Sequence, residues 1–424
     1  MAEIVTHRLP NGMLVLTQES HGAPVATCWV WYRVGSRNET LGSTGLSHWV
    51  EHMLFKGTPA LPKGEMDRLI ARNGGTFNAF TSNDFTAYFE TLPADRIELG
   101  LRIESDRMVN SLFEPQEVES ERTVIIAERE GYENEPDYWL NEAVTAAAFQ
   151  VHPYRNDVIG WTGDLLAITR DELFRHYQTY YTPNNAVLVL VGDFETGALM
   201  KQVEQYFAEL PAGPPVPPVR AREPEQQGER RVMVRRPGAA QYVQIVYHSQ
   251  HCRHPDFAPL LVLDAVLSGA KPLAGGGAQT NRSARLYRAL VETQLASYAG
   301  SSFRATIDPH LFEFSATVQE GHTADEVEAA LLAEVEKIQQ DGVSEAELAK
   351  VQKQVRAQLA YSGESVTNRA MLLGMWEVLD SYTRNDRLLE EVRAVTAEDV
   401  RRVAQEYLVE RRRTVGHFIP TETE

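Results

Sequence analysis

The chain has 424 residues, 43% of them hydrophobic, and a formal net charge of −18. This length exceeds what one hydrophobic core normally serves, so two or more domains are expected. The excess of acidic residues would repel a phosphate backbone and argues against nucleic-acid binding. The chain has no run of about 18 apolar residues, so no membrane span is predicted.

The first strands are predicted at the N-terminus, where MAEIVTHRLPNGMLVL alternates around an Asn11-Gly12 turn. This start has neither the apolar segment of a signal peptide nor an Arg-rich transit helix, so we expect a cytoplasmic location. Residues Val25 to Val34 predict the next strand. We expect Cys28 and Cys252 to be thiols, with one disulfide between them as the alternative.

The most informative motif is His48-Trp49-Val50-Glu51-His52. Two histidines four residues apart on a helix point the same way and can bind one metal ion. Glu51 lies close to that face, near enough to take a proton from water at the metal. The order HxxEH, the reverse of HExxH, is typical of zinc hydrolases, whereas a pair of ordinary surface histidines is the alternative.

The residues around this motif predict a helix with defined ends. Ser43 or Thr44 offers a side-chain oxygen as the N-cap, and Gly57 is the expected stop. Five apolar residues keep helical spacing: Leu46, Trp49, Val50, Met53 and Leu54. The two histidines would therefore be rigidly spaced.

A catalytic zinc needs a third protein ligand, and the acidic segment from Glu114 to Glu133 offers candidates. Pro115 suits the first position of a helix. Three apolar residues are expected to face the core: Val118, Val124 and Ile125. Three acids can then lie along one stripe: Glu117, Glu121 and Glu128. A solvated helix face explains the same spacing, so the pattern alone does not identify the ligand.

The proline-rich residues 211–228 predict an extended linker between two halves, 1–210 and 229–424. Both halves end alike, since helices capped by Thr169 and Thr396 lead into strands at Ala186 to Val191 and Thr414 to Ile419. We infer a duplicated domain, with coincidence as the alternative because capped helix–strand units are common.

Other periodic runs indicate the fold class. Thr86 to Leu92 predicts a strand, whereas Asp67 to Asn73 and Thr323 to Asp341 predict helices. This mixture indicates α+β halves, each with a mixed, mainly antiparallel sheet covered by helices.

Four stretches of the first half carry motifs of a known family. They are GSRNETLGSTGLSHWVEHMLFKGT from Gly35, GGTFNAFTSNDFTAYFETLP from Gly74, ERTVIIAERE from Glu121 and HPYRNDVIGW from His152. In this order they resemble the pitrilysin/insulinase family of zinc peptidases, and most closely its mitochondrial processing peptidase β-subunits and their bacterial relatives. The resemblance covers nearly the whole chain but is rich in motifs only in the first half. It implies two domains that face each other like a clam shell, with the metal in the first.

The resemblance also implies roles for single residues. It identifies Glu128 as the third zinc ligand, with Glu130 as the fallback, and gives Glu121 the role of orienting a ligand from behind. It implies that Asn78-Ala79-Phe80-Thr81 forms an edge strand to which a peptide adds by main-chain hydrogen bonds. A purely structural edge strand is the alternative.

In the second half, Ser283 to Val291 resembles the family's SRLY helix, after which several relatives carry an Arg and a Tyr that bind substrate. Tyr298 stands at the Tyr position, but Val291 occupies the place seven residues earlier, and Arg288 lies too early. A homologous metal-free partner chain would supply the missing pair, so we expect a heterodimer, with a homodimer as the alternative. Ordinary surface and core roles for Arg285, Arg288 and Tyr298 explain the sequence equally well.

Two other segments resemble sites but lack their full patterns. His248 to His254 has four possible metal donors but not the returning ligand pair of a zinc module, and Asp256 is expected to cap a helix there. Gly275-Gly276-Gly277 is predicted to be a loop rather than a phosphate cradle, because no GK[ST] follows.

The sequence thus predicts a zinc metalloendopeptidase acting on peptides or unfolded segments. His48, His52 and Glu128 would hold one zinc per chain, and Glu51 would be the general base. Two alternatives are a non-catalytic assembly subunit and a protein that binds peptides without cutting them. The complete HxxEH argues against the assembly subunit, because a retired site has no chemical need for Glu51.

Overall fold

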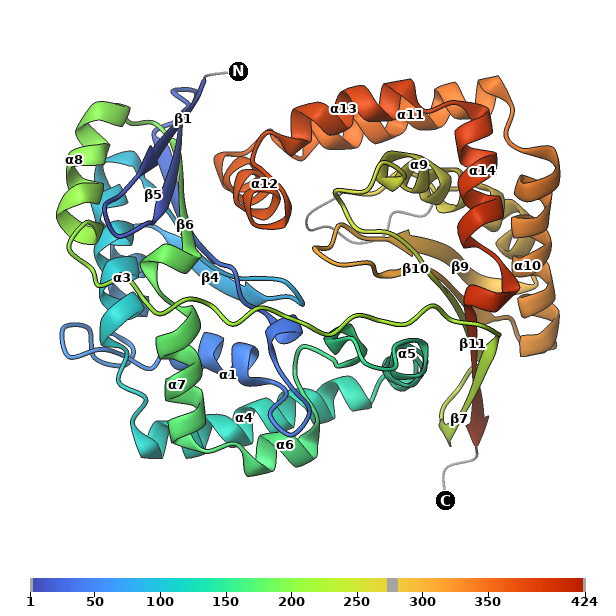
Figure 1. Cartoon of the computed structure of the whole chain (residues 1–424), viewed down its shortest axis with the longest axis horizontal. Helices are drawn as coiled ribbons and strands as arrows, with labels where there is room; N and C mark the ends of the chain where they lie inside the picture. Colours follow the sequence, from blue (N-terminus) through green and yellow to red (C-terminus); the bar gives the residue numbers. More distant parts are fainter. Residues whose placement is uncertain (1–2, 273–280, 422–424) are drawn as a thin grey trace. The chain divides into compact units, whose positions relative to one another are not determined.

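The computed structural model describes residues 3–272 and 281–421, and its contacts divide the chain into two compact units (Figure 1). Unit 1 comprises Met1–Glu130, Asn156–Arg220 and Gly363–Thr383; unit 2 comprises Gly131–Arg155, Ala221–Ser362 and Arg384–Glu424. The predicted loop at Gly275 to Gly277 lies outside the described residues. Among the described helices, none combines the length and apolar character that crossing a membrane requires.

The described part of unit 1 contains a six-stranded sheet in the order β1-β2-β6-β3-β5-β4. Strands β2 and β6 run parallel, and the other neighbours run antiparallel. The strands are β1 (Ile4–Arg8), β2 (Leu14–Glu19), β3 (Val25–Tyr32), β4 (Thr76–Thr81), β5 (Thr86–Pro93) and β6 (Ala186–Gly192). The helices are α1 (Leu46–Met53), α2 (Glu65–Arg72), α3 (Ile97–Asn110), α4 (Pro115–Glu133), α6 (Thr162–Ala167), α7 (Arg170–Tyr180), α8 (Thr196–Phe207) and α12 (Val366–Leu379).

Both faces of the unit 1 sheet are covered, which is why β3 is buried along almost its whole length. Side chains alternate across a strand, so Trp31 and Cys28 face opposite sides. Trp31 meets α12, where Gly374 approaches so closely that an added Cβ would overlap the indole. Cys28 meets α3 at Gly100, where a Cβ would lie 3.1 Å from the Cys28 Cβ.

The described part of unit 2 contains a five-stranded sheet in the order β7-β11-β8-β10-β9. Its strands are β7 (Arg230–Pro237), β8 (Tyr242–His248), β9 (Ala296–Phe303), β10 (Leu311–Val318) and β11 (Arg413–Thr421). Its helices are α5 (Pro136–Ala148), α9 (Phe257–Ser268), α10 (Ala324–Asp341), α11 (Glu345–Tyr361), α13 (Arg384–Ala394) and α14 (Ala397–Tyr407). Strands β7 and β11 are parallel and the other neighbours antiparallel, so the arrangement repeats that of β2-β6-β3-β5-β4. The predicted α+β class with two similar sheets is confirmed.

Two helices pack on a sheet whose strands come mainly from the other half of the sequence. Helix α12 comes from the second half but packs on β3 and β6, whereas α5 comes from the first half but packs on β7, β8 and β11. Gly416 of β11 permits the second contact, because a Cβ there would overlap Val144 of α5. The backbone of residues 211–228, all of it described, forms neither helix nor strand. The division of the sequence into domains at this linker stays a prediction.

Local predictions largely hold. Thr169 and Thr396 cap α7 and α14 with reciprocal capping boxes, and these helices lead into β6 and β11. One core assignment was wrong: Val118 and Ile125 are buried, but Val124 is 47% exposed. Val124 and Ile125 are adjacent and both apolar, so the helical pattern alone could not decide which of the two faces the core.

Candidate metal centre

Helix α1 carries the HxxEH motif in unit 1. Its apolar residues Leu46, Trp49 and Val50 are buried, which fixes the rotation of the helix about its axis. His48 and His52 are only partly buried, and their ring centroids lie 4.6 Å apart. The two imidazoles are therefore presented together, as their spacing predicted.

The start of α1 differs from the prediction. The N-cap residue is Gly45, whose φ of 91° is left-handed, rather than Ser43 or Thr44. Capping comes instead from Glu39, a buried carboxylate that accepts hydrogen bonds from the N–H groups of Gly45 at 2.7 Å and Ser47 at 2.6 Å. The carboxylate satisfies amides that lack a partner inside the helix and stabilises its positive end. Burial raises the pKa of Glu39 to about 7.

Thr44 is committed elsewhere, which explains why it does not cap the helix. Its N–H and Oγ1 both donate to Asp164, at 3.0 and 2.7 Å. The predicted stop was also displaced, because α1 ends at Met53 and Gly57 adopts its φ of 106° beyond the helix. The helix is thus shorter than predicted but retains the whole motif.

The third candidate ligand comes from α4, which begins at the predicted Pro115. Oε2 of Glu128 lies 3.7 Å from Nε2 of His48 and 3.6 Å from Nε2 of His52. Glu117 is paired with Lys63 at 2.6 Å, and the fallback Glu130 is exposed. The structure therefore brings Glu128 to both imidazoles.

Glu121 contacts the opposite side of His52, where it accepts a hydrogen bond from Nδ1 at 2.8 Å. Its other oxygen pairs with the Lys56 ammonium at 2.5 Å, a contact that the sequence reading missed. Burial alone would raise the pKa of Glu121, but His52 and Lys56 outweigh it and lower that pKa. An ionised Glu121 accepts the hydrogen bond from Nδ1 of His52, which leaves Nε2, 3.6 Å from Oε2 of Glu128, as the candidate metal donor.

The side chains of His48, His52 and Glu128 fit a zinc ion. One donor atom from each lies within 4.8 Å of the others. Burial, together with the neighbouring His52, lowers the pKa of His48 to about 3, so this imidazole is neutral and able to donate its lone pair. Two imidazoles and a carboxylate are the donor set of catalytic zinc sites that keep one position open.

Glu51 lies beside these donors with its carboxyl group buried. Burial raises its pKa, and Thr81 of β4 donates a hydrogen bond to Oε2 at 2.6 Å. A carboxylate with a raised pKa is better suited to accept a proton near neutral pH. Sequence reasoning missed the contact with Glu51, because nothing in the local pattern links a threonine at a strand end to a helix thirty residues earlier.

The predicted substrate residues Asn78, Ala79 and Phe80 lie on β4, at the end of the strand order. Among the described strands, β4 pairs only with β5, so its other edge is not covered by a strand. The Ala79 N–H donates to the Asn78 side chain at 2.9 Å. Helix α1 packs against β4, which brings this edge strand next to the HxxEH helix.

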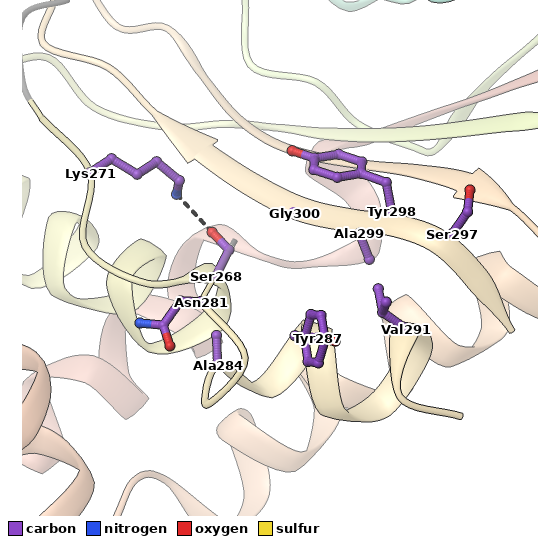
Figure 2. A pocket seen from close by; sticks show the side chains of 10 residues that line it. All are labelled: Ser268, Lys271, Asn281, Ala284, Tyr287, Val291, Ser297, Tyr298, Ala299 and Gly300. Carbon is purple, nitrogen blue, oxygen red and sulfur yellow. Dashed lines mark hydrogen bonds between the residues drawn. The ribbon is translucent and has the colours of Figure 1, made fainter. Parts of the chain in front are cut away.

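Tyr298 lies on β9 in unit 2 and is 44% exposed. Figure 2 shows that Tyr298, Tyr287 and Val291 are among the residues that line one pocket, and that the Tyr298 ring lies on the other side of β9 from Tyr287 and Val291. Arg288 is exposed, and Arg285 is held by Glu347 through hydrogen bonds of 2.9 and 2.7 Å. A role for Tyr298 in substrate binding stays a prediction.

A second set of metal-type donors, which the sequence reading missed, lies in unit 2: Asp325, Glu328 and His417. Both oxygens of Glu328 already accept hydrogen bonds from Arg231, and Nε2 of His417 lies 2.7 Å from Glu328. A cation would have to compete with the guanidinium group. We interpret this cluster as an ion-pair network.

The segment from His248 to His254 makes ordinary structural contacts. Nε2 of His248 hydrogen bonds to the Ala148 carbonyl at 2.9 Å. Asp256 is the N-cap residue of α9, as predicted, but its carboxylate binds Arg402 and Tyr407 instead of the helix amides.

Comparisons with family models, curated sequences and solved structures all find similarity to peptidases. The family described as "Insulinase (Peptidase family M16)" matches residues 14–161, and "Peptidase M16 inactive domain" matches residues 167–355. Zinc protease PqqE of Helicobacter pylori is 28% identical over 97% of this chain and 92% of its own length. A probable mitochondrial-processing peptidase subunit beta of Arabidopsis thaliana is 28% identical over 95% of this chain and 76% of its own. A crystal structure of a protease from Helicobacter pylori, 27% identical, has a TM-score of 0.93 and covers 99% of this chain and 100% of that one.

Proposed function

The chain belongs to peptidase family M16, the insulinase family, and on this premise we propose that it is a zinc-dependent endopeptidase that hydrolyses peptides or unfolded segments. One observation carries the proposal: Glu128 of α4 approaches Nε2 of both His48 and His52, and Glu51 is buried in α1, the helix of the two histidines. Three donors leave one zinc position open, as in catalytic rather than structural sites.

In this proposal each residue has a distinct task. When bound, zinc would polarise the scissile carbonyl and acidify water. Glu51 takes the proton from the attacking water and later passes it to the leaving amine. Glu121 accepts a hydrogen bond from Nδ1 of His52 and so fixes the orientation of that ring.

The substrate is proposed to bind as an added strand along β4, at Asn78, Ala79 and Phe80. Main-chain hydrogen bonds to a strand edge do not depend on the substrate's side chains, so broad sequence tolerance is expected. Tyr298 is proposed as a further substrate-binding residue. The strand edge of β4 would accept extended segments and exclude folded proteins, whose main chain is already paired.

The first prediction concerns Glu51→Gln, which preserves size but removes basicity. The variant is expected to keep its zinc and to lower kcat by about two to four decades, the usual scale for removing a general base. Turnover of an internally quenched peptide, with metal content measured in parallel, checks this. Undiminished turnover would exclude Glu51 as the base.

The same assay separates the alternatives when it is run with and without a chelator. A metallopeptidase loses turnover on chelation and regains it with zinc. A protein that binds the peptide without cutting it would be a binding protein, and one that does neither would fit an assembly subunit.

We also propose a cytoplasmic location. Cys28 and Cys252 are buried thiols rather than a disulfide, which supports a reducing compartment.

A further inference from the structure

The carboxylate of Glu51 is held by a residue outside its own helix. Thr81, the last residue of β4, lies with Oγ1 2.6 Å from Oε2 of Glu51. The threonine hydroxyl is the donor and the glutamate oxygen the acceptor. The distance is in the short range expected for a charged acceptor. The bond engages one carboxylate oxygen and leaves Oε1 for another partner.

The hydroxyl of Thr81 is itself constrained. A β-branched side chain has few χ1 rotamers, and β4 is paired along its length with β5. Directly opposite in the register lies Thr86, fully buried, whose Oγ1 is 3.3 Å from that of Thr81. Thr86 donates its own proton to the Val34 carbonyl at 2.9 Å. The Thr81 proton is therefore directed to Glu51.

Strand β4 has two tasks at this point. Its residues Asn78 to Phe80 form the edge proposed to receive the peptide, and Thr81 follows directly on them. A residue on this strand therefore stands at a fixed spacing from the substrate's main chain. A base held by the same rigid element as the substrate needs little reorganisation to reach the attacking water.

We propose that Thr81 is a positioning residue for the reaction: it fixes Glu51 through Oε2 so that Oε1 is presented to the attacking water. This inference rests on the proposed function, because it assigns Thr81 to the same hydrolysis. In this scheme the side chain of Thr81 touches neither the substrate nor the water and acts only through Glu51.

The test compares Thr81→Val, which keeps the shape of the side chain but removes the donor, with Thr81→Ser, which keeps the donor. Thr76→Val is the matched control, because Thr76 lies exposed at the other end of β4. Thr81→Val is expected to lower kcat by about tenfold to a hundredfold, the scale of a misplaced reacting group. KM and zinc content are expected to stay unchanged, Thr81→Ser to recover most of kcat, and Thr76→Val to match the wild type.

Several results would overturn the inference. A wild-type kcat in Thr81→Val would remove the role altogether. Loss of zinc or of thermal stability in step with kcat, or an equal loss in Thr81→Ser, would make the residue merely structural. If Thr81→Val does not fold, Thr81→Ala against Thr81→Ser makes the same comparison. A wild-type protein that cleaves no peptide overturns the proposed function as well, whereas active wild type with equally active Thr81→Val overturns this inference alone.

Discussion

At the residue scale, two glutamates of α4 have different tasks around one imidazole. Glu121 hydrogen bonds to Nδ1 of His52 at 2.8 Å, whereas Glu128 lies 3.6 Å from Nε2. Lys56 also binds Glu121 and helps to keep it ionised. Glu121 is thus committed to orienting the ring, and Glu128 is the carboxylate that also approaches His48.

The second prediction is that one zinc binds per chain through His48, His52 and Glu128. His48→Ala, His52→Ala and Glu128→Gln should each lose zinc, because three protein donors are needed for a stable site with an open position. Metal analysis after dialysis checks this. Glu130→Gln, an exposed acid on the same helix, is the control and should keep its zinc. Full zinc in Glu128→Gln would move the third ligand to Glu121 or Glu130.

At the element scale, α1 depends on a cap supplied from outside the helix. Gly45 has no side chain to accept from the first amides, and Glu39 takes over this role from six residues upstream. The arrangement ties the first turn of the HxxEH helix to the preceding loop. Ser47, whose N–H Glu39 accepts, directly precedes His48.

The third prediction is that Glu39→Ala destabilises the fold and weakens zinc binding together. Two buried amides would lose their partner, at a cost of about 1–3 kcal/mol each, and the first turn of α1 would be less well fixed. Unfolding in urea and zinc affinity are the measurements. The control is Thr169→Ala, which removes the N-cap of α7 at a cost of about 1 kcal/mol and should leave zinc affinity unchanged. Equal zinc affinity in both variants would contradict the prediction.

At the scale of the whole molecule, buried histidines in both units make stability depend on pH. Burial lowers the pKa of His176 in unit 1 and of His310 in unit 2 to about 3, from the ordinary 6.5. Above pH 6.5 neither the folded nor the unfolded chain protonates them. As the pH falls from 6.5 towards 3, the unfolded chain binds protons that the folded chain excludes. The free energy of unfolding then falls by up to about 1.4 kcal/mol per pH unit for each histidine.

The fourth prediction is that His310→Gln reduces the slope of the free energy of unfolding against pH. The reduction should correspond to about one fewer proton bound on unfolding. Urea unfolding at pH 7, 6 and 5 checks it, with the slope rather than the absolute stability as the readout. Loss of metal in acid affects wild type and variant alike, so the difference in slope isolates His310. Equal slopes would mean that His310 accepts its proton in the folded state.

The fifth prediction is that full activity requires a second chain of similar size, without HxxEH and with an Arg and a Tyr on the matching helix. The expectation comes from the contrast between a set of three candidate zinc donors in unit 1 and a valine, Val291, at the position where the resemblance predicts an Arg. Copurification from the native cell, followed by turnover assays alone and after reconstitution, checks it. Val291→Arg should raise the activity of the isolated chain. A homogeneous preparation that is fully active alone would rule the idea out.

The sequence by itself determined features that depend on spacing within one element. His48 and His52 share a face because any helix brings residues four apart together. Thr169 and Thr396 cap their helices because a capping box needs only an acid three residues later. The α+β class follows from the same local periods of helix and strand.

Only the tertiary structure decided which distant groups meet. Spacing along α4 offered three acids, and only the family resemblance singled out Glu128. The tertiary structure shows that Glu128 lies near His48, whereas Glu121 hydrogen bonds to Nδ1 of His52. The partners Thr81 and Glu39 come from a strand and a loop whose patterns say nothing of α1. The exchange of α5 and α12 between the two sheets depends equally on contacts far apart in the chain. Such contacts arise from the joint packing of many segments, and a periodic pattern describes only one segment at a time.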